Sequence, residues 1–178
     1  MLLATLTAVA VAQTWTVDDD GPAHFSDLPA AVAVAQSGDT LLVQPGAYTA
    51  FATSKSLTVL GPAAGPAPTV AGLSVVSDAE RFTVAGLAFD ALRFEDVTGR
   101  VRIDACEVLS VAAPLQGGLH LERCAEVVAS RLAIDLAATC VGDGANHALT
   151  SIDSNVHVAG STLRGGTGCN NGTPFPNG

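Results

Sequence analysis

The sequence predicts an all-β protein: a right-handed parallel β-helix (a solenoid) with a short N-terminal capping α-helix. Three observations lead to this fold class. A strand-bend-strand pattern recurs four times, its spacing lengthens in step with that of a shorter preceding strand, and aromatic residues make up only 4% of the 178 residues. A narrow interior filled by stacked small aliphatic side chains suits this composition, whereas a broad globular core relies on larger ones.

Residues 1–12 form the first element, which is expected to be a secretory signal peptide. An apolar run from Leu2 ends in Ala10-Val11-Ala12, a small-x-small pattern typical of a cleavage site. The run is too short to span a membrane, and no later segment is apolar enough to do so. No Lys or Arg precedes the run, so a buried strand is the alternative interpretation. The expected location is secreted or cell-surface.

Residues 13–71 are expected to form the N-terminal cap and the first coil. An open β-helix exposes strand edges and an apolar end, so its first coil needs a cover. A short helix can begin here with Ser26 or Asp27 as its cap and Pro29 in its first turn. Gly38 supplies a stop signal. The apolar residues of this helix recur at i, i+3, i+4 and i+7 and so share one face: Leu28, Ala31, Val32 and Ala35.

Residues 72–178 contain the repeat. The strand-bend-strand copies occupy 82–89, 101–108, 127–134 and 156–163, and a shorter strand precedes each, at 73–75, 92–94, 119–121 and 149–151. Successive starts are 19, 26 and 29 residues apart in the first series and 19, 27 and 30 in the second. Because the two series lengthen together, one three-stranded unit repeats, with insertions tolerated in a loop on one side. Equivalent strands of successive coils must then lie parallel, about 4.8 Å apart.

Two further features of this repeat region bear on the fold. A leucine-rich repeat would show an Asn or Cys ladder and a helical segment in each copy, and the sequence has neither. The final stretch, GGTGCNNGTPFPNG, is rich in Gly, Asn and Pro and is expected to be a loop rather than a cap. We therefore expect that the coils are truncated here or continue further in a longer chain.

The stretch from Trp15 to Gly61 resembles the N-terminal cap and first coil of secreted right-handed β-helix proteins of the pectin-lyase-like superfamily. The resemblance rests on VDDDGPAHFSDLPAAVAVAQSGDTLLVQPGAY followed by SKSLTVLG. It implies the fold and an extracellular setting, but no single activity, because that class holds lyases, hydrolases, epimerases, adhesins and inert stalks. The calcium-binding aspartates of the pectate lyases are not matched, since the aligned outward positions carry no carboxylate: Thr83, Arg102, Val128 and His157.

Four cysteines in an exported chain suggest disulfides. Cys140 and Cys169 each follow a repeat copy by six residues, so they should occupy the same loop position in adjacent coils. One coil spacing is within the Cα separation that a disulfide tolerates, and we expect a Cys140–Cys169 bridge. Cys106 is expected to point inward as a small hydrophobe and Cys124 to lie at a bend, with no pairing indicated for either.

The charge of the chain limits its partners. A formal net charge of −9 argues against nucleic acid and against anionic membrane surfaces, because either partner requires clustered Lys and Arg. The acidic residues also supply a candidate calcium site, since hard cations favour clustered oxygens. This site would comprise Asp18, Asp19, Asp20 and Asp39. An ordinary acidic turn is the alternative interpretation of the DDDG sequence.

The candidate catalytic face lies on the short first strands of the two middle coils. Arg93 and Glu95 belong to one coil and His120 and Glu122 to the next, so Glu95 should stack near Glu122 and Arg93 near His120. Two carboxylates about 5 Å apart would repel, which raises the pKa of one or attracts a cation, and the separation suits the acid and the nucleophile of a retaining glycosidase. An exposed ladder, softened by Arg93 and His120, is the alternative.

Two functions are therefore expected from the sequence. The first is a non-catalytic secreted or cell-surface scaffold whose outer face contacts polysaccharide or protein, because its outward residues are mostly small and neutral. The second is a carbohydrate-active enzyme, a lyase or hydrolase of acidic polysaccharide that uses Arg93, Glu95, His120 and Glu122. The single Trp and the single Tyr both lie near the cap, which leaves few aromatic platforms for sugars and counts against the enzyme.

Overall fold

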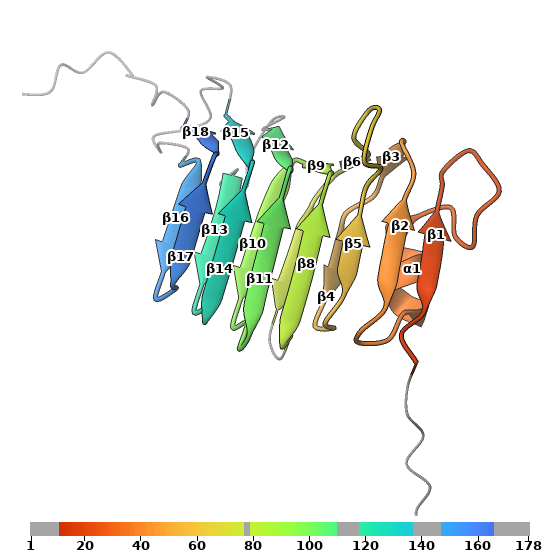
Figure 1. Ribbon diagram of the computed structural model, residues 1–178, viewed down its shortest axis with the longest axis horizontal. Coiled ribbons are helices and arrows are strands. Elements are labelled where there is room, and N and C mark those ends of the chain that lie inside the picture. Colours follow the sequence, from red (N-terminus) through yellow and green to blue (C-terminus); the bar gives the residue numbers. More distant parts are fainter. Residues whose placement is uncertain (1–10, 77–78, 110–117, 137–146, 166–178) are drawn as a thin grey trace, which may run out of the picture.

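The structure is a parallel β-helix built from three sheets (Figure 1). The computed structural model describes residues 11–76, 79–109, 118–136 and 147–165. Within these segments the chain passes through the three sheets in turn, so that each full coil contributes one strand to each sheet. Every strand pairing described is parallel, which confirms the predicted fold class.

The three sheets are named A, B and C in the order in which a coil visits them. Sheet A consists of β1 (Thr14–Val17), β2 (Thr40–Val43), β5 (Thr58–Leu60), β8 (Arg81–Ala85), β11 (Arg100–Asp104), β14 (Glu126–Ser130) and β17 (Val156–Ala159). Sheet B consists of β3 (Ala47–Tyr48), β6 (Thr69–Val70), β9 (Ala88–Phe89), β12 (Glu107–Leu109), β15 (Ala133–Asp135) and β18 (Thr162–Arg164). Sheet C consists of β4 (Phe51–Thr53), β7 (Leu73–Val76), β10 (Ala91–Glu95), β13 (Gly118–Glu122) and β16 (Leu149–Ile152).

The register between coils follows the sequence repeat. Phe82 pairs with Val101, Val101 with Val127, and Val127 with Val156 in sheet A. The shorter preceding strands pair in the same way in sheet C, where Leu73, Leu92, Leu119 and Leu149 form one row. The predicted stacking is confirmed, because a strand alternates its side chains and keeps the same set facing inward only when the register is preserved.

Inward side chains fill a continuous apolar interior. The aliphatic row of sheet A is almost fully buried over five coils: Leu41, Val59, Val84, Ile103 and Ala129. Phe82 and Phe94 meet across the interior with ring centroids 6.0 Å apart and steeply inclined planes, an edge-to-face arrangement. Stacked small side chains therefore make up most of the core, as the composition indicated.

Two corners of the coil turn on residues with positive φ. Directly after the sheet A strands from β8 onward, these residues are Gly86, Ala105, Arg131 and Gly160. Between sheets C and A they are Asp96, Arg123 and Asp153. The first set occupies the bend position of the sequence repeat, so the left-handed conformation is the physical form of the predicted bend. Glycine adopts it readily, whereas the other residues do so against a steric cost.

The N-terminal cap contains the predicted helix, α1 (Leu28–Val34). Asp27 is its N-cap, and the Asp27 carboxylate accepts hydrogen bonds from the backbone N–H groups of Leu28 (2.8 Å) and Thr49 (3.1 Å). The predicted face of the helix is buried, and it packs against β4, the edge strand of sheet C. The helix therefore covers the edge at which sheet C would otherwise be open, while β1 extends sheet A beyond β2.

The structure describes two of the four cysteines, Cys106 and Cys124. Cys106 and Cys124 are both buried and are not joined in a disulfide. Cys106 occupies the same inward row as Leu87 and Leu132, as expected, and Cys124 lies in the corner after β13. The predicted Cys140–Cys169 bridge lies outside the described residues, as does most of the predicted signal peptide of residues 1–12.

Candidate functional site

The candidate face lies on the outer side of sheet C, on strands β10 and β13. The two strands pair in parallel with Glu95 opposite Glu122 and Arg93 opposite His120, so the expected stacking of these four residues is present. Alternation along each strand directs Phe94 and Leu121 into the core and leaves the polar residues outside. Parallel pairing of two similar strands is thus sufficient to bring the four side chains together.

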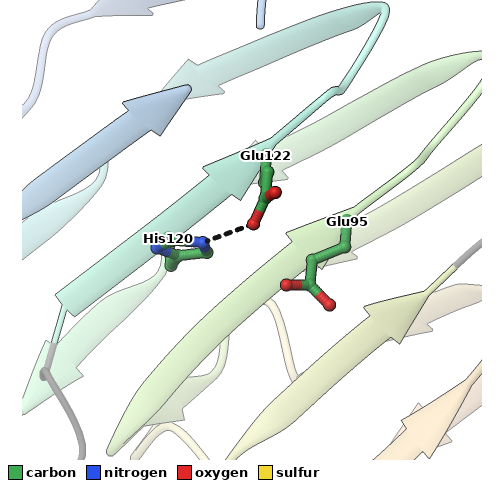
Figure 2. A group of neighbouring side chains, drawn as sticks. All are labelled: Glu95, His120 and Glu122. Atoms are coloured by element: carbon green, nitrogen blue, oxygen red, sulfur yellow. Dashed lines mark hydrogen bonds and ion pairs between the residues drawn. The ribbon is translucent and has the colours of Figure 1, made fainter. Parts of the chain in front are cut away.

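Three of these side chains converge closely (Figure 2). One donor atom from each of Glu95, His120 and Glu122 lies within 4.8 Å of the other two. His120 Nε2 is 3.5 Å from Glu122 Oε2, and the side chains of these two residues are only 20% and 24% exposed. The trio is therefore half-buried although it lies on an outward face.

Arginines surround the trio and hold its carboxylates. Arg93 pairs with Oε1 of Glu95 in the same strand, and Arg123 pairs with Oε1 of Glu122. Arg123 also grips Asp96 of the preceding coil, with Nε 2.5 Å from Oδ1 and Nη2 3.0 Å from Oδ2. The face consequently joins two coils through a network of charged hydrogen bonds.

Sequence reasoning missed Arg123 and Asp96. The same alignment that places Glu95 beside Glu122 places the next residues, Asp96 and Arg123, beside each other, so the signal was available one position further along the repeat. Both residues have positive φ, which turns their backbones at the corner between sheets C and A. Glycine in a sequence often indicates positive φ, whereas arginine and aspartate indicate it less clearly.

The electrostatics of the face differ from the expectation at Glu122. Repulsion between the two glutamates was expected to raise the pKa of one of them. Instead, hydrogen bonds from Arg123 and then from His120 hold the pKa of Glu122 below its ordinary value. Arg123 lowers the pKa of Asp96 in the same way. At Glu122 and Asp96, these hydrogen bonds outweigh the desolvation that would raise the pKa.

The four aspartates proposed for calcium fall into two places. Asp18, Asp19 and Asp20 follow β1 and bring one carboxylate oxygen each within 4.8 Å of the others. Asp39 precedes β2 and therefore lies at the opposite end of the β1–β2 pair. In the acidic turn, the Asp19 carboxylate accepts a hydrogen bond from the Ala47 N–H at 2.9 Å. The turn thus ties the chain after β1 to the start of β3.

Asp39 instead joins segments of the N-terminal cap through hydrogen bonds. Its carboxylate accepts hydrogen bonds from the backbone N–H of Gln13 (2.7 Å), the backbone N–H of Gln36 (2.8 Å) and the indole N–H of Trp15 (3.0 Å). Burial alone would raise the pKa of Asp39, but these hydrogen bonds outweigh it and the pKa lies below the ordinary value. The residue is 3% exposed, so its oxygens face protein groups rather than solvent.

Two hollows on the described surface lie away from the candidate face. One, of about 510 Å³, is lined by Ser37, Gly38, Ser56, Leu57, Thr58, Glu80 and Arg81. Another, of about 360 Å³, is lined by Val11, Gln13, Trp15, Val34, Gln36 and Asp39. Neither hollow contains Glu95, His120 or Glu122, so the candidate face is not the floor of either one.

The architecture defines this chain as a parallel β-helix with an α-helical N-terminal cap. A search of family models, of curated proteins and of solved structures found nothing that matches it. Within the described segments, no helix combines the length and the apolar character that crossing a bilayer requires. The fold assignment therefore rests on sheet topology and register.

Proposed function

We propose that this chain is a secreted or cell-surface β-helix scaffold whose outer faces contact polysaccharide or protein, without catalysis by the described coils. The proposal is supported by the way charged groups on the outer faces are used. Arg123 bridges Glu122 and Asp96, Arg131 bridges to Asp104, and Arg100 reaches Glu126, 2.8 Å away, in the next coil. These pairs connect successive coils, which is a structural use of the ionisable groups.

The distribution of aromatic side chains agrees with a scaffold. Trp15 is packed edge-on against His24 and Phe25 and gives its indole N–H to Asp39. Tyr48 is buried, and its hydroxyl donates to the Gln44 carbonyl oxygen at 2.9 Å. Because these are the only Trp and Tyr of the chain, neither amphipathic ring is displayed beside the candidate face as a stacking platform.

The extracellular setting and the family belong to the same proposal. The segment that resembles the cap of secreted pectin-lyase-like proteins, residues 15–61, folds as β1, α1 and the strands β2 to β5. These elements are the cap and first coil that the resemblance implied, which supports membership of that superfamily. The apolar start of the chain and the excess of acidic residues support export.

A carbohydrate-active enzyme is the second candidate, because one observation favours it. Glu95 and Glu122 face each other across one strand spacing, with His120 beside them, and paired carboxylates at such a separation can serve as acid and nucleophile. In this reading Arg93 would bind an acidic substrate group. Acidic polysaccharide, cleaved either by elimination or by hydrolysis, is the substrate class that fits.

One screen separates the two candidates. Purified full-length chain is incubated with polygalacturonate, alginate and neutral glycans, with and without calcium, and both bound material and new reducing or unsaturated ends are measured. The matched variants are Glu95→Gln/Glu122→Gln and, on sheet A, Glu126→Gln. We expect no cleavage by any of the three proteins. Cleavage that only the double variant abolishes would overturn the scaffold proposal and establish the enzyme.

A further inference from the structure

We infer that Glu95, His120 and Glu122 form a binding site for a divalent first-row transition-metal ion, with zinc as the reference case. The inference is independent of whether the chain is a scaffold or an enzyme. It rests on the parallel register of β10 and β13, which places one imidazole and two carboxylates around a common point on the outer face of sheet C (Figure 2).

The donor set selects the class of ion. An imidazole nitrogen binds zinc and its transition-metal neighbours well, whereas calcium and magnesium prefer sites made of oxygen alone. Three protein ligands with the remaining positions open to water is an arrangement typical of zinc sites that are not purely structural. The set of His120, Glu95 and Glu122 supplies one nitrogen and two oxygens on a solvent-facing surface.

The distances are close to those required. A tetrahedral ion with metal–ligand bonds of about 2.0–2.1 Å separates its ligand atoms by roughly 3.4 Å. His120 Nε2 and Glu122 Oε2 are already 3.5 Å apart. No two of the three ligand atoms are more than 4.8 Å apart, so a ligand atom needs to move in by at most roughly 1.4 Å. A rotation of the Glu95 side chain, which starts from the neighbouring strand, can provide this movement.

Arginines hold one oxygen of each carboxylate, and at Glu122 the other oxygen faces His120. Arg123 holds Oε1 of Glu122, while Oε2 of the same carboxylate faces His120. Arg93 holds Oε1 of Glu95. Each guanidinium therefore restricts one carboxylate and stands where an outer hydrogen-bond partner of a metal ligand is usually found.

The local charge also favours a cation. The network contains three carboxylates, of Glu95, Glu122 and Asp96, against the two guanidinium groups of Arg93 and Arg123, which leaves one net negative charge. The paired positions in the flanking coils are uncharged: Ser74, Val76, Thr150 and Ile152. No further basic side chain of the paired strand positions competes with the ion.

Zinc titration of the full-length chain tests the inference. After removal of metal by a chelator, we expect calorimetry to show one Zn²⁺ per chain, with a dissociation constant on the order of micromolar. His120→Gln and Glu122→Gln should each weaken binding at least about tenfold, as changes around metal ligands do. His157→Gln is the matched control, because His157 is an exposed histidine on β17 of sheet A, and it should bind as the parent does.

A second readout excludes other ligands and loss of folding. Zn²⁺ should raise the unfolding temperature of the parent and of His157→Gln, but not that of His120→Gln, while circular dichroism confirms that all three are folded. Co²⁺ bound in place of zinc should show a spectrum without a thiolate charge-transfer band. Binding that His120→Gln leaves unchanged, a cysteine signature with Co²⁺, or displacement of Zn²⁺ by millimolar Ca²⁺ would each overturn the inference.

Discussion

Arg131 grips Asp104 of the preceding coil with two parallel donors: Nε lies 3.0 Å from Oδ1 and Nη2 lies 2.5 Å from Oδ2. Asp104 ends β11, and its carboxylate also accepts the hydroxyl of Ser130 at 2.8 Å. The Arg123–Asp96 pair repeats the arrangement at another corner, with the same sequence separation of 27 residues. In both pairs the arginine has positive φ, so the left-handed corner aims its side chain back along the stack.

The Asp104–Arg131 pair should contribute measurably to stability. A double-mutant cycle of Asp104→Asn and Arg131→Gln should give a favourable coupling free energy, because the Asp104 side chain is only 14% exposed although the Arg131 side chain is 69% exposed. Arg102→Gln is the control, since Arg102 approaches the same carboxylate only to 3.8 Å. Equal coupling for both arginines, measured by urea unfolding, would contradict the bidentate account.

The same pair should make stability depend on acid. Arg131, and after it Ser130, holds the pKa of Asp104 below its ordinary value of 3.8. A lowered folded pKa means that the contribution is fully present above 3.8 and is lost as the pH falls through the folded value. Between pH 5 and pH 3, Arg131→Gln should therefore lose less stability than the parent chain. Parallel acid profiles for the two proteins would show that Asp104 is not responsible.

Lys55 should stabilise the C-terminal end of α1. Its Nζ donates to the carbonyl oxygens of Val32 (2.7 Å), Ala33 (3.1 Å) and Ala35 (2.7 Å), which have no partner within the helix end itself. Lys55→Met keeps the aliphatic stem and should lower the free energy of unfolding by about 1–2 kcal/mol. Thermal or urea unfolding measures this loss.

A chemical test of the same contact is available because Lys55 is the only lysine of the chain. An amine-reactive acylating reagent should modify Lys55 slowly in the folded protein and rapidly in denaturant, as followed by peptide mass spectrometry. The terminal amine serves as an internal reference for the reactivity of an ordinary amine. Equal rates of Lys55 modification in both conditions would show that the lysine does not hold the helix.

Two glycines should respond very differently to the same substitution. A Cβ at Gly99 would overlap the carbonyl oxygen of Glu80, which itself accepts the Arg100 N–H, so Gly99→Ala must displace backbone and should cost about 1–3 kcal/mol or more. Gly160 has φ of 57° and no atom within 4 Å of an added Cβ. Gly160→Ala should therefore cost only about 1 kcal/mol. Comparable losses in urea unfolding would contradict this distinction.

The thiol of Cys106 should be unreactive in the native state. It is 1% exposed, and burial raises its pKa to about 11, so very little thiolate is present at neutral pH. Iodoacetamide labelling at pH 8, followed by peptide mapping, should leave the Cys106 and Cys124 peptides unmodified until denaturant is added. Native-state labelling of Cys106 would show that the coil interior opens on the timescale of the reaction.

The fold could be predicted because it depends on local alternation and on a repeat. The row of Phe82, Val101, Val127 and Val156 follows from residues that alternate in and out, and parallel coils add no other requirement. Asp27 as a helix cap is equally local, since its carboxylate meets the N–H of the very next residue, Leu28. These features need only the neighbouring sequence and the period of the coil.

The parts that sequence reasoning missed depend on long side chains that cross between coils. Lys55 lies several strands after α1 in the sequence and still contacts its C-terminal end. The ion pairs of Arg123 and Arg131 require both the strand register and a left-handed backbone at the arginine. Arginine is not a residue that signals such a backbone. The candidate face could be located from the stacking of outward strand positions alone. The lowered pKa of Glu122, however, depends on Arg123, which follows the strand and is not one of those positions.

From β9 onward, the connections between sheet B and sheet C lengthen along the stack. A single residue separates Phe89 from Ala91, residues 110–117 separate β12 from β13, and residues 136–148 separate β15 from β16. The strands on either side keep their register throughout. This corner should therefore accept an inserted foreign peptide, for example between Leu109 and Gly118, without loss of register in the flanking strands. If such coils were repeated in series, copies of the peptide would be spaced at regular intervals along the stack.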